Sequence, residues 1–144
     1  MRDTYVRRAF IYRVYDGDTV WFHADLGYGQ YAVRQCGRLL GVNTPELKGS
    51  DKDLGILSRN FLADKIVTYC PYVEGLGYEC DIRSEKTDSF GRWLIDLWFS
   101  EANASDLIIL AGMGEIYGGP KTWASHPRQF VPTYDILPLI GARK

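Results

Sequence analysis

The chain has 144 residues, 46% of them hydrophobic, and a formal net charge of −1. This length suits one domain with a core of its own, and the hydrophobic content excludes intrinsic disorder. Because the sequence pI is about 6.1, an anionic partner would have to be held by local groups of Arg and Lys rather than by a global positive field.

The termini and the cysteines bear on location and redox chemistry. The first residues, MRDTYVRR, lead into no uninterrupted apolar segment, and the longest apolar run, Leu107–Ala111, is far too short to span a membrane. We therefore expect no membrane association and a location that is cytoplasmic or unknown, since a removed leader would leave no trace. Cys36, Cys70 and Cys80 form no CxxC pair, which favours buried free thiols over a zinc site or disulfides. We expect His23 and His126 to be surface or half-buried residues.

The first third of the chain predicts β structure. The expected strands are Tyr5–Tyr15, Thr19–Phe22 and Tyr31–Val42. Asp-Gly at positions 16 and 17 predicts a tight hairpin turn in which Gly17 takes a positive φ. Gly37 predicts a bend or a bulge in the third strand.

The middle of the chain predicts a helix, a second pair of strands and another helix. The polar segment 47–53 reads as a loop, and the expected elements after it are a helix over Leu54–Cys70, strands over Cys80–Arg83 and Trp93–Phe99, and a helix over Ala102–Met113. Ser105 is a candidate cap for the last helix. Since Leu107–Leu110 is apolar on every side, we expect this helix to be buried.

The last part of the chain, 118–144, is a proline-rich extension. Its prolines exclude long regular elements, and its aromatic residues Trp123, Phe130 and Tyr134 predict that it packs along the body. We expect a single domain over 1–144 of the α+β class, with a five-stranded β-barrel and two or three packed α-helices.

Three places combine charged residues with turns. Asp16, Asp18 and Thr19 gather oxygen atoms around one glycine, which suits a hard cation such as Ca²⁺ or Mg²⁺. In the stretch RLLGVNTPE (38–46), Pro45 keeps Thr44 extended, so a rigid turn can direct a main-chain carbonyl and the Glu46 side chain towards one point. Each place also has an ordinary structural explanation, as a common hairpin turn or a solvated strand end.

The third place is the segment TDSFGR (87–92). Arg92 follows the turn directly and could hold a phosphate through two parallel hydrogen bonds, although a surface Arg beside Asp88 is the plainer reading. Acidic oxygens for a cation, one glutamate and two arginines, Arg38 and Arg92, are the parts that phosphodiester hydrolysis needs.

Three motifs carry a family resemblance. VYDGDTV, RLLGVNTPE and TDSFGR occur in the order and spacing of the staphylococcal nuclease (thermonuclease) family, which the chain resembles from about Val14 to about Gly114. The resemblance implies an OB-type barrel and Ca²⁺-dependent cleavage of DNA and RNA that leaves 3′-phosphate ends. It also implies a monomer that acts on single-stranded or frayed nucleic acid with little sequence preference.

The resemblance assigns residues to three roles. They are the metal-binding residues Asp18, Asn43, Thr44 (through its main-chain carbonyl) and, in the outer shell, Asp16; the catalytic residues Arg38, Glu46 and Arg92; and the substrate-contacting residues Ser89, Phe90 and Tyr117. Glu46 would take a proton from water or orient it, the two arginines would grip the scissile phosphate, and Asp88 would brace the hairpin. Tyr28 and Tyr31 are further candidates for ligand contact.

The chain departs from the family pattern at several of these positions. Asn43 stands where the best-known member has a second calcium-binding aspartate, so we expect weaker Ca²⁺ binding. Ser89 and Phe90 replace a lysine and a tyrosine that hold a terminal phosphate there. A catalytically weak or inactive OB-type module that binds nucleic acid or protein therefore stays open as an alternative. An Mg²⁺-dependent phosphatase or nucleotide-binding enzyme is not supported, because the sequence has no Gly-rich phosphate loop and no paired DxD phosphatase pattern.

Overall fold

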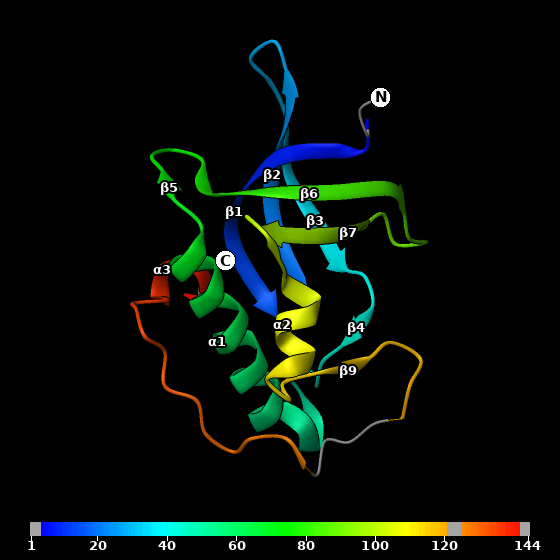
Figure 1. The fold of residues 1–144 in the computed structure, drawn as a ribbon, viewed down its shortest axis with the longest axis vertical. Coiled ribbons are helices and arrows are strands. Elements are labelled where there is room, and N and C mark those ends of the chain that lie inside the picture. The colour runs from blue at the N-terminus through cyan, green and yellow to red at the C-terminus, as the bar shows by residue number, and fades with distance from the viewer. Residues whose placement is uncertain (1–3, 121–124, 142–144) are drawn as a thin grey trace.

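Five strands close into a barrel in the computed structural model, which describes residues 4–120 and 125–141 (Figure 1). They are β1 (Val6–Asp16), β2 (Thr19–Gly27), β3 (Gln30–Leu39), β6 (Gly77–Thr87) and β7 (Trp93–Phe99). The first three strands form an antiparallel meander, and β3 runs parallel to β7. Strand β6 pairs with both β7 and β1 and so closes the ring. The expected α+β, OB-type barrel is confirmed.

Helices and short strands complete the described fold. The helices are α1 (Lys52–Tyr69), α2 (Ala104–Leu110) and α3 (Leu137–Ile140), with a 3₁₀ turn at Gly49–Asp51; the short strands are β4 (Val42–Asn43), β5 (Tyr72–Val73), β8 (Ala102–Asn103) and β9 (Glu115–Ile116). Strands β4 and β9 pair in a small separate sheet. In Figure 1 the helices lie below the barrel, and β4 leads down from β3 beside α2.

The barrel interior follows the two-residue period of the strands. Val20, Phe22 and Ala24 alternate into the core from β2, and α1 adds Leu62 and Ile66 from outside the barrel wall. Gly37 is buried, and an added Cβ at this position would lie 2.8 Å from side-chain atoms of both Phe22 and Ile95. The irregularities in the β2–β3 pairing fall elsewhere, so the predicted bulge at Gly37 is wrong and the glycine serves close packing instead.

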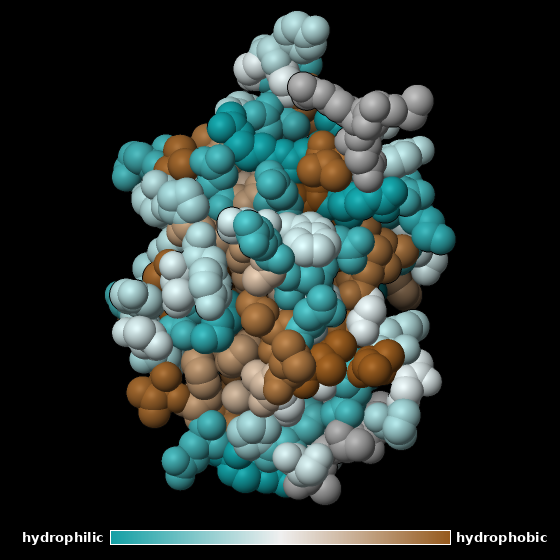
Figure 2. Space-filling view, in the orientation of Figure 1, coloured by the Kyte–Doolittle hydropathy of each residue, from teal (hydrophilic) through white to brown (hydrophobic). Residues whose placement is uncertain are grey.

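Helix α2 differs from its prediction in two ways. Its N-terminal cap is Asn103, whose side chain accepts a hydrogen bond from the Asp106 backbone N–H, whereas the Ser105 hydroxyl donates to the Leu40 carbonyl. Ile108 is buried, but Leu110 is 82% exposed. The helix therefore packs through one face only, and apolar side chains gather on the surface over it (Figure 2).

The C-terminal segment runs along α1 before it ends in α3 (Figure 1). The buried Asp64 carboxylate accepts hydrogen bonds from the backbone N–H groups of Thr133 and Tyr134, and the Phe61 and Phe130 rings meet edge to face at 5.5 Å. These contacts fasten the proline-rich segment to the body; Trp123 lies outside the described residues.

The three cysteines are free thiols. Cys70 and Cys80 are buried, and burial raises the pKa of Cys70 to about 12. Within 4–120 and 125–141, no helix is long and apolar enough to cross a membrane.

Candidate active site

The turn between β1 and β2 carries the first part of the candidate site. The Asp18 side chain is buried, and its Oδ2 accepts hydrogen bonds from the Thr44 backbone N–H at 3.2 Å and from Thr44 Oγ1 at 3.1 Å. Its Oδ1 accepts a hydrogen bond from Thr19 Oγ1 at 3.1 Å. This one carboxylate therefore joins the acidic turn to the polypeptide that leaves β4.

Gly17 makes the close approach of these two segments possible. An added Cβ would lie 2.8 Å from both Ser58 Cβ and Thr44 Oγ1. Its φ is not among the positive values of the chain, so the predicted positive φ is wrong. A side chain at this position would push the turn away from both α1 and Thr44.

Asp16 gives the turn its unusual electrostatics. Its Oδ1 accepts a hydrogen bond from the Asp18 backbone N–H at 3.1 Å. Burial and then the neighbouring Asp18 charge raise the pKa of Asp16 to about 7. The fold thus brings two carboxylates together in a partly buried place, where their desolvation and mutual repulsion disfavour ionisation. A bound cation would offset both effects.

The donors near this turn are all oxygen atoms. Such donors fit a hard divalent cation. Burial is the largest cause of the raised pKa of Asp16, and the charge of Asp18 adds to it. No group of three or more His, Cys, Asp or Glu side chains that could hold a metal is found among the residues that the structure describes. The half-buried Asn43 and the Thr44 carbonyl would therefore have to complete a metal shell.

Glu46 follows Thr44 and Pro45 and is exposed. It lines a small pocket of about 130 Å³ together with Tyr15, Asp16 and Lys48. Behind it, an added Cβ on Gly55 of α1 would lie 2.3 Å from the Glu46 carbonyl oxygen. The glycine allows the helix to press against this turn, which fixes the backbone from which the Glu46 side chain extends.

Arg38 lies next to the acidic turn at the end of β3. Its Nη1 donates to the carbonyls of Leu39 and Val42 at 2.8 and 2.9 Å, and lies 3.4 Å from Asp18 Oδ2. Arg38 pairs in parallel with Leu94 of β7, and Arg92 directly precedes that strand, so both arginines lie at the same groove.

Asp88 holds Arg92 in place. Its Oδ1 accepts hydrogen bonds from the backbone N–H groups of Phe90 and Arg92, both at 2.9 Å, and its Oδ2 accepts one from Arg92 Nε at 2.7 Å. Partial desolvation acts to raise the pKa of Asp88, but these hydrogen bonds together keep it below its ordinary value. The guanidinium of Arg92 is thereby oriented by its own hairpin.

A groove of about 330 Å³ joins the two arginines and the predicted substrate-contacting residues. Arg38, Arg92, Ser89, Phe90 and Tyr117 all line it. The Arg38 guanidinium carbon lies 5.8 Å from the centre of the Tyr117 ring, and that of Arg92 lies 5.9 Å from the centre of the Phe90 ring. Phe90 is 84% exposed, so its ring face is accessible to a ligand.

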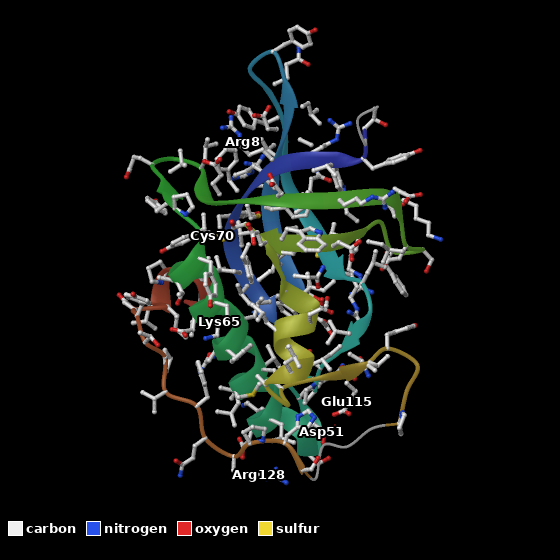
Figure 3. All side chains as sticks on the ribbon, in the orientation of Figure 1. Arg8, Asp51, Lys65, Cys70, Glu115 and Arg128 are labelled. Carbon is white, nitrogen blue, oxygen red and sulfur yellow. The ribbon has the colours of Figure 1, made fainter. Side chains whose placement is uncertain are left out.

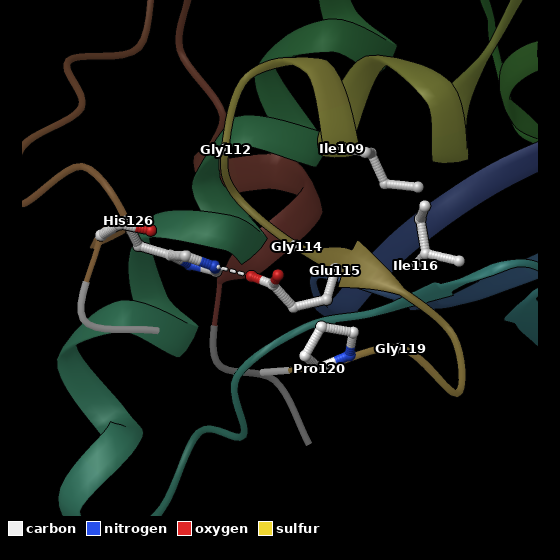
Figure 4. A pocket seen from close by; sticks show the side chains of 9 residues that line it. Ile109, Gly112, Gly114, Glu115, Ile116, Gly119, Pro120 and His126 are labelled. Carbon is white, nitrogen blue, oxygen red and sulfur yellow. Dashed lines mark hydrogen bonds and ion pairs between the residues drawn. The ribbon is translucent and has the colours of Figure 1, made fainter. Parts of the chain in front are cut away.

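Asn43 pairs across the small sheet with Glu115. The Glu115 carboxylate contacts Nε2 of His126 in a pocket walled by Gly112, Gly114 and Gly119 (Figure 4). His126 is 5% exposed, so the expectation of a surface or half-buried histidine is wrong. Nothing in the spacing of the two residues predicts this pair, because the tertiary fold alone brings them together.

The candidate site occupies the end of the barrel nearest the helices. Glu115 lies at this end, whereas Arg8, which is paired with Asp25 at 2.9 Å, lies towards the opposite end (Figure 3). Tyr28 is fully exposed in the β2–β3 turn, and the Tyr31 ring lies 6.2 Å from that of Phe10. Neither tyrosine lines the groove, so the structure does not bring them to the predicted ligand.

Several residues of the site were not predicted. Lys48 lies beside Glu46, and Leu40 and Gly41 line the groove. Gly55 carried a usable signal, since a glycine inside a helix usually has a packing or functional reason.

In comparisons with known proteins, no family model and no curated protein matches this chain.

Proposed function

We propose that the chain is a Ca²⁺-dependent nuclease that hydrolyses DNA and RNA with little sequence preference, as its resemblance to the staphylococcal nuclease family suggests. The observation that carries the proposal is the groove in which Arg38 and Arg92 meet, with Arg38 only 3.4 Å from the Asp18 carboxylate. A phosphate held by both arginines would lie next to the acidic turn.

Asp18, Asn43 and the Thr44 carbonyl would hold the cation, with Asp16 behind them. Bound Ca²⁺ would supply positive charge that polarises a phosphoryl oxygen. The raised pKa of Asp16 supports this assignment, because two close carboxylates gain most from a neighbouring cation.

The chain's own groups would perform the remaining steps. Glu46 would accept a proton from the attacking water, whose oxygen forms the new bond to phosphorus. Arg38 and Arg92 would stabilise the charge on the phosphoryl oxygens. The bond to the 5′ oxygen would break, and that oxygen would take a proton from solvent, which leaves a 3′-phosphate and a 5′-hydroxyl.

The groove suits an unpaired nucleotide. Phe90 and Tyr117 present exposed rings on which a base can stack, and Ser89 adds a hydroxyl beside them. Since the whole chain has a net charge of −1, these local contacts would carry the affinity for a monomeric enzyme acting on single-stranded or frayed ends.

A non-catalytic nucleic-acid-binding or protein-binding module is the second candidate. It is favoured by Asn43, which removes a carboxylate from the metal set, and by the engagement of Arg38 with two carbonyls of its own chain. A module of this kind would bind its ligand in the groove and would not hydrolyse phosphodiester bonds.

One experiment separates the two. The purified protein is incubated with single-stranded DNA or RNA in Ca²⁺, in Mg²⁺ or in chelator. The nuclease proposal expects cleavage in Ca²⁺, none in chelator, and 3′-phosphate ends on the products. Binding without cleavage under every metal condition would leave the module as the function.

A further inference from the structure

An aromatic groove lies on the outer side of the barrel, apart from the candidate active site. It encloses about 300 Å³ between β1, β2, the β5–β6 hairpin and α3. Tyr12 and His23 form one wall, stacked at 4.6 Å with 19° between their planes. Tyr72 and Tyr78 form the opposite wall and meet edge to face at 5.2 Å.

The groove is a built feature of the fold. Gly77 has a φ of +130°, and an added Cβ would lie 2.5 Å from the Ile11 carbonyl oxygen, so only glycine lets the hairpin approach β1 this closely. Pro138 and Leu139 of α3 line the groove from the other side. The close approach at Gly77 therefore fixes the hairpin that carries Tyr78 against β1, which carries Tyr12.

Arginines flank the Tyr12 wall. The Arg34 backbone N–H donates to His23 Nδ1 at 3.0 Å. Burial raises the pKa of Tyr12, and the charges of Arg34 and then Arg13 oppose that rise. Nε of Arg13 is buried, and no hydrogen-bond partner for it lies among residues 4–120 and 125–141. Arg13, which follows Tyr12 directly on β1, and Arg34 therefore offer positive charge to an anion bound at this wall. Asp135 is the negative charge that acts on Tyr78 of the other wall.

Strand β1 links the groove to the candidate active site. Tyr12 and Asp16 are four residues apart on β1, a separation of roughly 13 Å along a strand. Between them lie Arg13 and the exposed Tyr15, and Tyr15 itself lines the pocket that contains Asp16 and Glu46. A flexible polyanion could follow this line from one pocket to the other.

We infer that the aromatic groove binds an unpaired base of a single-stranded nucleic acid, between the tyrosine walls and with a neighbouring phosphate on Arg13 or Arg34. Base stacking on aromatic rings combined with arginine contacts to the backbone is the usual chemistry of single-strand binding. The position of the groove relative to the scissile bond rests on the proposed function, but the binding itself does not. A proline-rich peptide, which also prefers tyrosine-lined grooves, is the competing occupant that the test must exclude.

The test measures binding of fluorescein-labelled dT12 in chelator by fluorescence anisotropy. The variant Tyr72→Ser/Arg34→Asn removes one exposed ring and one cation; Asn suits position 34 because Arg34 has a positive φ of 52°. The matched control Tyr28→Asn/Arg7→Gln removes the same groups far from the groove. We expect the groove variant to bind about tenfold more weakly, as expected for the loss of one stacking contact, and the control to bind as the wild type does.

A second measurement uses only the wild-type protein, so it does not depend on the folding of a variant. The dT12 strand carries 5-iodouracil, is crosslinked by light, and the modified peptides are mapped by mass spectrometry. Crosslinks at Tyr12, Tyr72 or Tyr78 support the inference. Crosslinks confined to other residues, unchanged affinity in a folded groove variant, or no dT12 binding by the wild type, whether or not it binds oligoproline, would overturn it.

The two proposals fail independently. Cleavage of thymidine 5′-(4-nitrophenyl phosphate) needs the catalytic pocket alone, so its cleavage in Ca²⁺ reports on the nuclease and not on the groove. If the wild type does not cleave it while the groove variant loses dT12 binding, the nuclease proposal fails and the groove stands. If the wild type cleaves it and both variants bind dT12 equally, the groove inference fails and the nuclease stands.

Discussion

The Asp18 carboxylate accepts two hydrogen bonds from Thr44, one from the backbone and one from the side chain, at 3.2 and 3.1 Å. These residues are 26 positions apart and belong to different elements. The contact fixes the acidic turn against the turn that carries Glu46, so the relative position of the proposed metal-binding and catalytic groups depends on it.

Thr44→Val therefore should loosen the site while keeping the shape of the side chain. Removal of a hydrogen bond to a buried carboxylate is expected to lower the free energy of unfolding by about 1.5–3 kcal/mol, as measured by urea denaturation. Thr68→Val is the matched control, since Thr68 Oγ1 donates to the Asp64 carbonyl of its own helix, and it should cost less. Equal losses in the two variants would show that Asp18 gains nothing special from Thr44.

The Asp16 carboxyl should make the metal-free protein less stable as pH rises. Its folded pKa of about 7 lies above the ordinary value of 3.8, so the folded state binds more protons than the unfolded state between these values. The contribution of Asp16 to stability is then fully present below about pH 4 and is lost progressively towards pH 7, by a few kcal/mol at most.

Asp16→Asn tests this sign. In chelator, the variant should gain stability over the wild type at pH 8 and much less at pH 5, as measured by urea unfolding. Asp25→Asn is the control, because hydrogen bonds from Gly27 and then Arg8 lower the pKa of Asp25, so its effect should be the same at both values. A wild-type minus Asp16→Asn difference that does not change with pH would contradict the assignment.

Asn43→Asp should strengthen calcium binding. The added carboxylate raises the charge of the proposed ligand set, and calcium affinity rises with ligand charge. We expect a lower dissociation constant in isothermal titration calorimetry, with Asn60→Asp on α1 as a control that leaves it unchanged. An unaltered constant in Asn43→Asp would remove Asn43 from the metal site.

Much of this fold could be predicted from local patterns, and the turns of the site were found because charge and turn residues coincide there. The β-branched and aromatic residues of β1 and β7 predict these two strands. The rigidity of an X-Pro turn at Pro45 predicts that Glu46 belongs to the site. The parallel pairing of β3 with β7 could not be predicted, because it depends on how the barrel closes.

The errors share one physical cause, which is tertiary contact between segments far apart in the chain. The sequence predicts a positive φ as the reason for glycine at position 17. The structure instead requires glycine there because Ser58 and Thr44 pack directly against its backbone. The apolar residues around Leu110 predict that it is buried, but it is exposed because α2 packs through one face. His126 is buried because the fold brings Glu115 to it.

Gly55→Ala should disturb the site from behind. An added Cβ would lie 2.3 Å from the Glu46 carbonyl, so α1 or the turn has to shift even though alanine favours the helix. Overpacking of this kind typically costs about 1–3 kcal/mol, and we expect lower stability in urea together with weaker cleavage. Lys52→Ala, at an exposed position of the same helix, should leave both unchanged. A stabilised Gly55→Ala protein would contradict the packing described.

The central claim is tested most directly by Glu46→Gln in single-turnover cleavage of single-stranded DNA with Ca²⁺. Loss of a general base is expected to slow the chemical step by about 10²–10⁴-fold, while calorimetry shows Ca²⁺ and DNA bound as in the wild type. Glu101→Gln, an exposed glutamate in the β7–β8 turn, should cleave normally. If Glu46→Gln cuts as fast as the wild type, Glu46 does not activate the water and the proposed mechanism is wrong.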